Sequence, residues 1–344
     1  MDRDNIYETL TSLGYKLSDR GSYWQTNALY RNGDNRTALQ IYKDTGIWKD
    51  YVEQTPYMPF EKLLKITLNT DDDNEIKNYI KDDFPLRVVQ SKQKIEMEKI
   101  YSEDVLSKLL PHYKFYNDKG IDDQTLKLFK GGLATNGNMF QRFVFPIYNL
   151  NNQIHGFSGR DMVNSKNRPK WKHMGVKSKW LFPNHLSSDS IKKKNEVILV
   201  ESIGDVLNLF QNGYKNVLCT FGLEISPSLI SYLIGLNPQK IIISFNDDSK
   251  SSFNSGKFGA LKNFFKLQGF FDNSKLYTHL PSLNDFGDMS SNDINDWYNS
   301  FLSIEKEDHD INIIKEFEIF LEATPIKSSK KIEQTFKKFK KTYE

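Results

Sequence analysis

Residues 197–206 read VILVESIGDV, and they open the stretch, residues 197–288, that decides the fold. This stretch holds four short apolar runs, at residues 197–201, 216–220, 240–245 and 275–279. Segments with helical spacing separate the runs, at residues 203–212, 226–236 and 257–268. Short runs rich in Val and Ile that alternate with longer amphipathic segments predict βαβ units, and therefore a parallel sheet covered by helices on both faces.

Polar and mostly acidic residues follow three of the four predicted strands. They are Glu201 and Asp205, then Asn246, Asp247 and Asp248, then Asp285 and Asp288. A single Asp or Asn at such a place is equally well explained as a helix cap or a turn residue. Three groups on strands of one sheet point further, because the working site of such sheets lies at the carboxyl ends of the strands.

Carboxylates crowded at one edge repel one another, and a hard divalent cation with oxygen ligands relieves that repulsion. We therefore predict that these seven residues form a site for Mg²⁺, or for Mn²⁺ in its place. Mg²⁺ is held by a few carboxylates and leaves positions open for water and for substrate phosphates.

The same residues resemble the TOPRIM domain of DnaG-type DNA primases. The family's Glu-Gly-Tyr-x-Asp-Val segment is matched by ESIGDV at residues 201–206, its Asp-x-Asp motif by NDD at residues 246–248, and its Asp-x-x-Glu/Asp element by DFGD at residues 285–288. The resemblance implies that Glu201, Asp248, Asp285 and Asp288 are catalytic. Ser202 and Asn246 depart from the pattern, and the amide of Asn246 leaves open how the metal is shared.

Composition sets broad limits on the chain. It has 344 residues, enough for two or three domains, and a net charge of only +3, so any basic surface is local. The single cysteine, Cys219, lies in a predicted strand, which excludes intrachain disulfides and suits a reducing compartment. No secretory signal is evident, and no apolar run approaches the ~20 residues that span a bilayer. We expect a cytoplasmic protein without membrane contact, in the host cell if a phage encodes it.

Residues 1–70 are predicted to form a short helix and a small antiparallel sheet, followed by a second helix. Their order resembles the N-terminal zinc ribbon of the same primases. Residues 1–111 contain neither Cys nor His, so no tetrahedral zinc site is expected there, and aromatic contacts would replace the metal. The unit is interpreted either as a reader of template sequence or as a structural cap. Residues 71–99 are dominated by charge and are predicted to be a linker.

Residues 100–190 are predicted to form an α+β subdomain with a strand, hairpin and strand followed by a basic loop. Cations interleaved with aromatic rings suit phosphates and unpaired bases, although a basic loop is also a common solvated surface. The RFVFPI, GFSGR and PKW segments resemble the nucleic-acid cleft of the primase RNA polymerase core. The resemblance assigns nucleotide and template binding to Arg142, Arg160, Lys170, Trp171, Lys172, Lys177 and Lys179.

By the same resemblance, residues 191–290 would form the TOPRIM domain, and residues 291–344 are predicted to be a helical, basic tail. Its last helix carries three lysine pairs around Phe336 and Phe339. By resemblance this helix would dock on a replicative helicase. The alternative is a frayed, solvated helix.

The resulting prediction is an α/β protein: a TOPRIM parallel sheet with flanking helices, preceded by a basic α+β subdomain and a small zinc-ribbon-like β domain without zinc ligands. The resemblance implies a DNA primase, most like a stand-alone primase subunit of a tailed phage. It would synthesise short RNA primers from ribonucleoside triphosphates on single-stranded DNA and work with a separate helicase. Two alternatives stay open, a TOPRIM-type nuclease and a catalytically weak subunit that binds single-stranded DNA.

Overall fold

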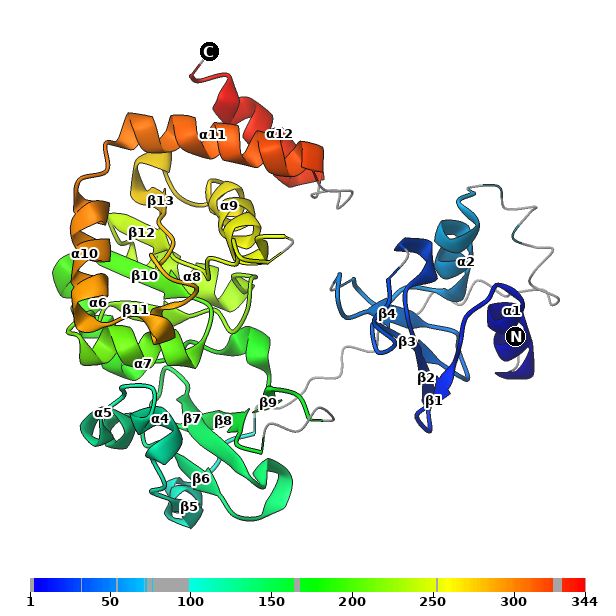
Figure 1. Ribbon diagram of the computed structural model, residues 1–344, viewed down its shortest axis with the longest axis horizontal. Coiled ribbons are helices and arrows are strands. Elements are labelled where there is room, and N and C mark those ends of the chain that lie inside the picture. Colours follow the sequence, from blue (N-terminus) through cyan, green and yellow to red (C-terminus); the bar gives the residue numbers. More distant parts are fainter. Residues whose placement is uncertain are drawn as a thin grey trace. The chain divides into compact units, whose positions relative to one another are not determined.

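The computed structural model describes residues 3–31, 33–53, 55–70, 72, 76, 99–163, 168–251, 253–323 and 330–343. The chain forms two compact units, Met1–Ile95 and Glu96–Glu344, and each is described by itself (Figure 1). The predicted linker, residues 71–99, lies outside the described residues except for Asp72, Ile76 and Lys99.

The first unit is an antiparallel sheet with the strand order β1-β2-β3-β4 and a helix at either end of its sequence. Its elements are α1 (Arg3–Ser12), β1 (Ser18–Asp19), β2 (Tyr23–Thr26), η1 (Leu29–Arg31), β3 (Leu39–Tyr42), β4 (Trp48–Asp50) and α2 (Phe60–Leu68). Trp24 and Trp48 lie in the core, as the expected aromatic contacts require. Tyr23 and Tyr42 do not: they lie half-buried on the other face and contact each other, because side chains alternate along a strand.

A four-stranded parallel sheet forms the centre of the second unit, and this confirms the prediction made from residues 197–288. Its order is β11-β10-β12-β13, with β10 at Glu196–Val200, β11 at Val217–Cys219, β12 at Lys240–Ile243 and β13 at Leu276–Thr278. The helices are α6 (Asn184–Lys194), α7 (Ile203–Gln211), α8 (Pro227–Leu236) and α9 (Ser255–Leu267). Alternate residues of β10 enter two separate cores, so both faces of the sheet are buried.

A five-stranded antiparallel sheet with the order β5-β6-β7-β8-β9 precedes the parallel sheet. Its strands are β5 (Leu109–Leu110), β6 (Gly132–Ala134), β7 (Arg142–Tyr148), β8 (Ile154–Asp161) and β9 (Trp171–Met174), with η2 (Glu103–Lys108), α4 (Lys114–Asn117) and α5 (Asp123–Leu128) beside them. The 3₁₀ helix η2 stops at Lys108, because Leu109 and Leu110 pair with β6 instead. One core cluster contains Phe143 and Phe145 of this sheet together with Ile198 and Val200 of the parallel sheet.

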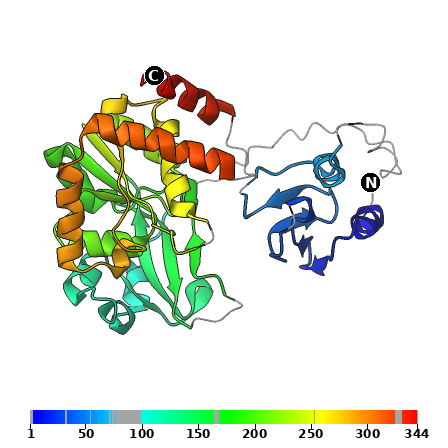
Figure 2. The ribbon, with the colours of Figure 1, turned by 45° about the horizontal axis from the view of Figure 1, so that its top comes forward.

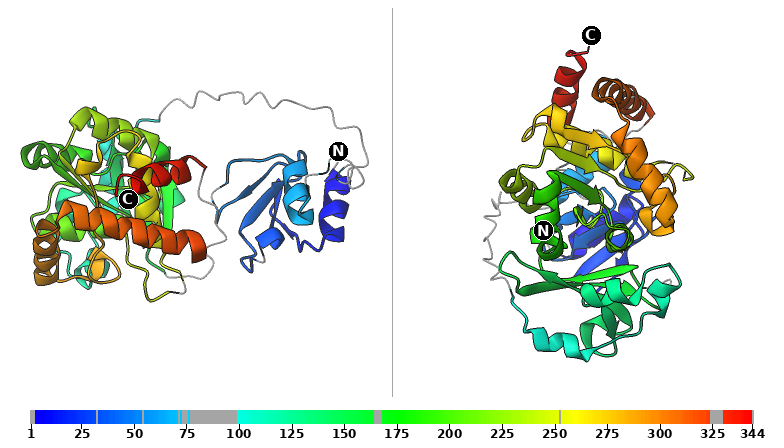
Figure 3. Two further views of the ribbon diagram at one scale, coloured as in Figure 1. Left: turned by 90° about the horizontal axis from the view of Figure 1, so that it is seen from above. Right: turned by 90° about the vertical axis from the view of Figure 1, so that its left-hand side faces the viewer.

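Three helices end the chain: α10 (Ser291–Leu302), α11 (Lys306–Ala323) and α12 (Lys330–Lys340). Figures 2 and 3 show α11 and α12 beside α9. Phe336 and Phe339 of α12 are 5% and 7% exposed, and their rings pack against Phe265. A frayed, solvated helix is therefore wrong for α12, which buries its apolar face against the body of the unit.

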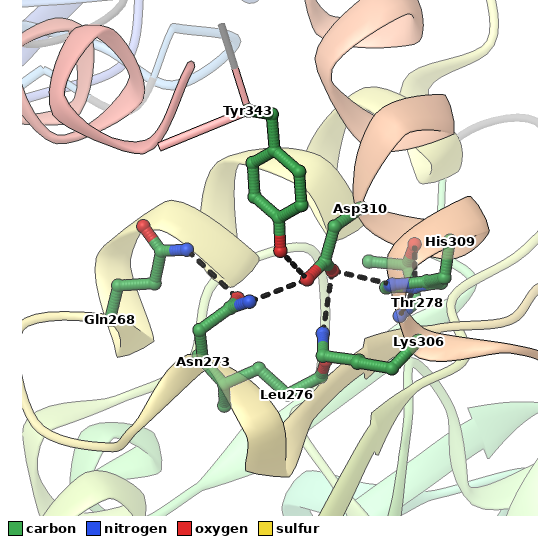
Figure 4. Close-up of polar contacts among 8 residues, drawn as sticks. All are labelled: Gln268, Asn273, Leu276, Thr278, Lys306, His309, Asp310 and Tyr343. Carbon is green, nitrogen blue, oxygen red and sulfur yellow. Dashed lines mark hydrogen bonds and ion pairs between the residues drawn. The ribbon is translucent and has the colours of Figure 1, made fainter. Parts of the chain in front are cut away.

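A buried carboxylate ties these helices to the sheet (Figure 4). Asp310 is fully buried and accepts hydrogen bonds from Asn273 Nδ2 at 2.5 Å, Tyr343 Oη at 2.6 Å and Lys306 Nζ at 2.6 Å. Thr278 N donates to Nε2 of His309, so the ring proton lies on Nδ1 and is donated to Asp310 at 2.9 Å. No helix in the described part of the chain is long and apolar enough to span a bilayer.

Candidate functional site

A cavity of about 290 Å³ lies between the carboxyl ends of the parallel strands and the antiparallel sheet. Its wall on the parallel-sheet side is polar and acidic, with Glu201, Ser202, Asp205, Asn246 and Asp285. Its opposite wall is cationic and aromatic, with Phe115, Tyr116, Lys119, Arg160, Lys170, Trp171 and His173. Two walls of opposite character therefore face one space, and each contains residues predicted from the sequence.

The first acidic pair is fixed by the start of α7. Glu201 follows β10 directly, and Ser202 caps the helix, accepting a hydrogen bond from Asp205 N at 3.4 Å. In return, Ser202 N donates to Asp205 Oδ2 at 3.0 Å, which completes a capping box. Asp205 Oδ1 is buried and has no hydrogen-bond partner among the described residues. One oxygen of a buried carboxylate is thus left available for a ligand.

The electrostatics of this wall are unfavourable in the protein alone. Burial, followed by the negative charges of Asp248 and Asp285, raises the pKa of Glu201 to about 7. Burial, followed by the charge of Asp285, raises the pKa of Asp205 to about 7. The pKa of Asp285 is also raised, by burial first and then by Asp288. Carboxylates that hold their protons so strongly lack sufficient positive charge nearby.

The other predicted acids lie beside the cavity rather than on its wall. Asp248 Oδ2 accepts a hydrogen bond from Gly256 N at 3.0 Å, at the beginning of α9. Asp247 Oδ1 accepts one from Asn254 Nδ2 at 2.6 Å. Asp288 is exposed, and its N–H donates to Asp285 Oδ1 at 3.1 Å. A Cβ on Gly256 would lie 1.9 Å from the carbonyl oxygen of Asn246, so glycine is needed for α9 to approach this turn so closely.

The acidic wall suits a hard divalent cation in its chemistry. Within the described ranges, no group of three or more His, Cys, Asp or Glu side chains has the spacing of a metal site. The donors are nevertheless all oxygens, burial and neighbouring carboxylates raise the pKa values of Glu201 and Asp205, and Asp205 Oδ1 has no hydrogen-bond partner among the described residues. These are the properties of oxygen ligands that a divalent cation would bring together.

The cationic wall is built around Arg160. Its guanidinium carbon lies 5.6 Å from the ring centroid of Phe115 and 5.8 Å from that of Trp171. Its Nε is buried without a hydrogen-bond partner among the described residues. Cation–π contacts on two rings hold the guanidinium in place while a donor remains unused. Lys170, which is exposed, extends the positive wall next to Trp171.

Several residues of the cavity were not among the predicted site residues. Lys119 lines it, and the charge of Lys119 counteracts the rise in the pKa of Asp285. Ser158 and His173 form a hydrogen bond of 3.1 Å on adjacent strands, and burial lowers the pKa of His173 to about 4, so its ring is neutral at pH 7. Lys119 lies in a loop between two short helices, where nothing in the local sequence indicates a cavity.

Four of the predicted binding cations do not line this cavity. Arg142, assigned by resemblance to nucleotide and template binding, is only 2% exposed and donates to the carbonyl oxygens of Gly159 and Pro169. The reason is that β7 starts in the interior, where its first residue lies opposite a buried residue of β8. Lys172 and Lys177 are exposed and donate to the carbonyl oxygens of Asn138 and Phe221. Lys179 lines a different cavity, of about 760 Å³.

Comparisons with known proteins point to one class of enzyme. The chain is similar to the DNA primase of Helicobacter pylori, with 28% identity over an alignment of 186 residues that covers 43% of this chain and 33% of that protein. It is also similar to the DNA primase of Rickettsia felis, with 35% identity over an alignment of 125 residues that covers 33% of this chain and 20% of that protein. The chain therefore spans a third or less of the length of these relatives. No protein-family model matches it.

Among solved structures, the chain resembles the zinc-binding and RNA polymerase domains of the Aquifex aeolicus primase. The TM-score is 0.50 at 17% sequence identity, and the match covers 98% of this chain and 96% of that one. At this identity the likeness shows the fold, which is the mixed α/β fold of a primase core with its parallel sheet.

Proposed function

We propose that this chain is a DnaG-type DNA primase, which synthesises short RNA primers on single-stranded DNA during replication. The observation that carries the proposal is the cavity with two opposed walls, acidic at the ends of parallel strands and cationic with aromatic rings across from them. Template-directed nucleotidyl transfer needs both kinds of wall, one for charge on the reacting phosphates and one for the nucleic acid. The similarity to bacterial DNA primases supports the same reaction.

The acidic wall would hold Mg²⁺ or Mn²⁺. The predicted ligands are Glu201, Asp205, Asn246 and Asp285 from the cavity wall, with Asp247, Asp248 and Asp288 beside it. When bound, the cation supplies positive charge to the triphosphate and to the attacking 3′-hydroxyl. The capping box at Ser202 keeps one carboxylate oxygen of Asp205 fixed and the other one free. The chain itself thus positions charge, and no nucleophilic side chain is required.

The cationic wall would bind template and incoming nucleotide. Arg160, Lys170 and Lys119 offer charge to phosphates, and Trp171 offers a flat ring on which a base can stack. Three exposed cations on the same segment would extend the binding path of the single-stranded DNA template. They are Lys172, Lys177 and Lys179. Base stacking contributes about 1–3 kcal/mol for each base and tolerates any sequence.

The finer features of the proposal come from the resemblance in the sequence. They are a TOPRIM domain in the parallel sheet, a zinc-free relative of the zinc ribbon in the first unit, and a tailed-phage primase subunit that works with a separate helicase. Support for a zinc-free unit is that residues 1–111 hold neither Cys nor His. Ribonucleoside triphosphates are the proposed substrates.

One assay distinguishes this function from its rivals. Single-stranded DNA carrying an end label is incubated with Mg²⁺ and ribonucleoside triphosphates carrying a second label, and both labels are followed by gel electrophoresis. A primase makes short labelled RNA and leaves the template intact. A nuclease shortens the template. A subunit that only binds DNA shifts the template in a native gel and makes no RNA, and either of these results would overturn the proposal.

A further inference from the structure

Arg142 and Asp161 are buried opposite each other at one end of the β7–β8 pair. They are register partners, and each is 2% exposed. Arg142 Nη1 donates to the carbonyl oxygens of Gly159 at 3.1 Å and Pro169 at 3.0 Å, and Nη2 lies 3.9 Å from Asp161 Oδ1. A Cβ on Gly159 would be 3.1 Å from Cβ of Arg142, so the arginine stem packs directly over this glycine.

A second arginine reaches the same carboxylate from the loop side. Arg168 Nε lies 2.9 Å from Asp161 Oδ1. Its Nη1 donates to Gln141 Oε1 at 3.0 Å, and its Nη2 donates to the carbonyl oxygen of Phe140 at 2.7 Å. The carboxylate therefore lies between two guanidinium groups. We name these three residues, Arg142, Asp161 and Arg168, the arginine clamp.

The arginine clamp holds the chain where it enters the cavity. Arg142 binds the carbonyl oxygen of Pro169, and Asp161 N donates to the carbonyl oxygen of Lys170 at 2.9 Å. These hydrogen bonds fix the backbone at Pro169 and Lys170, directly before Trp171. The side chains of Lys170 and Trp171 line the cationic wall. Trp171 is in turn the register partner of Arg160, so the direction of β9 sets the distance between the ring and the guanidinium.

We infer that Arg142 is a positioning residue that orients Lys170 and Trp171 for the template strand, and that it does not itself bind phosphate. This inference rests on the proposed function. Among the described residues this guanidinium is only 2% exposed, its Nη1 already donates to two backbone acceptors, and its Nη2 lies toward a carboxylate, which leaves little surface for a phosphate. Its charge is used inside the protein, where an unpaired cation would be costly.

The sign of one substitution separates the two roles. Asp161→Asn removes a negative charge and keeps the size of the side chain. If Arg142 were a phosphate ligand, this change would leave single-stranded DNA binding equal or tighter, because the site becomes more positive. A positioning role predicts the opposite result, because the segment at Pro169 that leads into β9 would be held less firmly. Affinity for a single-stranded oligodeoxynucleotide, measured by fluorescence anisotropy, should then fall about tenfold, the size of effect expected for residues that act through one another. Equal or tighter binding overturns the inference.

A double-mutant cycle tests whether Arg142 acts through the cavity wall. Arg142→Lys keeps the charge, but a single ammonium group cannot reproduce the fork that spans two carbonyl oxygens. It is expected to weaken binding about tenfold in the natural chain and less than about twofold when added to Lys170→Ala with Trp171→Ala. Equal effects in both backgrounds would show that Arg142 acts independently of that wall and would overturn the inference.

Controls distinguish misfolding and failure of the premise. Thermal melting of each variant shows whether it is folded, and if Asp161→Asn is not folded, the cycle with Arg142→Lys decides the question. If the natural chain binds no single-stranded DNA, the proposed function falls and the inference falls with it. If the natural chain binds single-stranded DNA but the variants of the arginine clamp give the results expected for a phosphate ligand, the proposed function stands and only the inference is wrong.

Discussion

Two regions of the second unit bury carboxylates and treat them in opposite ways. At Asp310, burial alone would raise the pKa, but hydrogen bonds from His309, Lys306 and Tyr343 hold it below its ordinary value. At Asp205, burial raises the pKa to about 7, the charge of Asp285 adds to the rise, and one oxygen has no partner among the described residues. The difference is the supply of donors, which is complete in one region and incomplete in the other.

This comparison shows how a structural carboxylate can be told from a functional one. Asp310 is satisfied by the protein, and its bonds join α11 to Asn273, which precedes β13, and to Tyr343, which follows α12 (Figure 4). The acidic wall is left unsatisfied by the protein, and its repulsion is relieved only when protons or a cation supply positive charge. We therefore expect substitutions at Asp310 to change stability and substitutions in the acidic wall to change activity.

The largest effect is expected for Glu201→Gln. The substitution removes one charge from the acidic wall, and primer synthesis should fall by about a thousandfold, the upper range for losing a preorganised electrostatic group. The melting temperature measured without divalent cations should be unchanged or slightly higher, because repulsion among the carboxylates is relieved. Glu224→Gln is the matched control, because Glu224 is an exposed partner of Lys266 away from the cavity and should keep full activity. An active Glu201→Gln would remove the acidic wall from the reaction.

Asp310→Ala should act in the opposite way. Four donors would lose their acceptor, and the free energy of unfolding should fall by about 3 kcal/mol, as for breaking a buried ion pair. Urea denaturation measures this loss, and activity per folded molecule should be retained. A loss of activity without a loss of stability would contradict the division between the two regions.

The parts of the structure that the sequence predicted are those set by local pattern. Ile241, Ile242 and Ile243 are buried on both faces of the sheet, so an uninterrupted apolar run indicates a parallel strand correctly. Glu201 and Asp285 line the same cavity because they follow parallel strands of that sheet. The predicted direction of the strands is therefore enough to place these residues near one another.

The parts that were missed depend on pairing between distant segments. Arg142 looks like a strand-flanking cation, but its burial follows from the β7–β8 register opposite Asp161. Lys119 reaches the cavity only because the loop that follows α4 lies beside the parallel sheet. Asp310 reads as a polar residue of an amphipathic helix, and its donors come from residues 273, 306, 309 and 343. Local sequence carries no information on such partners.

The pH dependence of stability should also separate the regions. The pKa values of Glu201 and Asp205 rise from 4.5 and 3.8 to about 7, so the folded chain binds protons more tightly than the unfolded chain. Without divalent cations, the contribution of these two groups to stability should therefore be most favourable at low pH and fall as the pH rises from about 4 to about 7, by roughly 2 kcal/mol per group after solvent screening. Asp310 has a lowered pKa, so it stabilises the fold at pH values above the ordinary pKa of an aspartate. That stabilisation is lost as the pH falls. Urea denaturation in EDTA checks this, and Glu201→Gln should flatten the decline toward pH 7.

The smallest effect is expected for Asn246→Ala. Its amide lines the cavity but brings no charge, so primer synthesis should fall only about tenfold, close to the net value of one hydrogen bond to a charged group. Asn246→Asp supplies the missing carboxylate and should tighten Mg²⁺ binding. If Asn246→Ala is as inactive as Glu201→Gln, the amide is a required ligand and the ranking of the acidic wall is wrong.

Direct binding of Mn²⁺, followed by electron paramagnetic resonance, tests most directly whether the acidic wall is a cation site. The natural chain should bind Mn²⁺, and Mg²⁺ should compete for the same site. Glu201→Gln should weaken that binding at least about tenfold through the loss of one charged ligand, and Asp310→Asn, in any molecule that remains folded, should leave it unchanged. Mn²⁺ binding that is insensitive to Glu201→Gln, or that is lost on changing Asp310, would contradict the account.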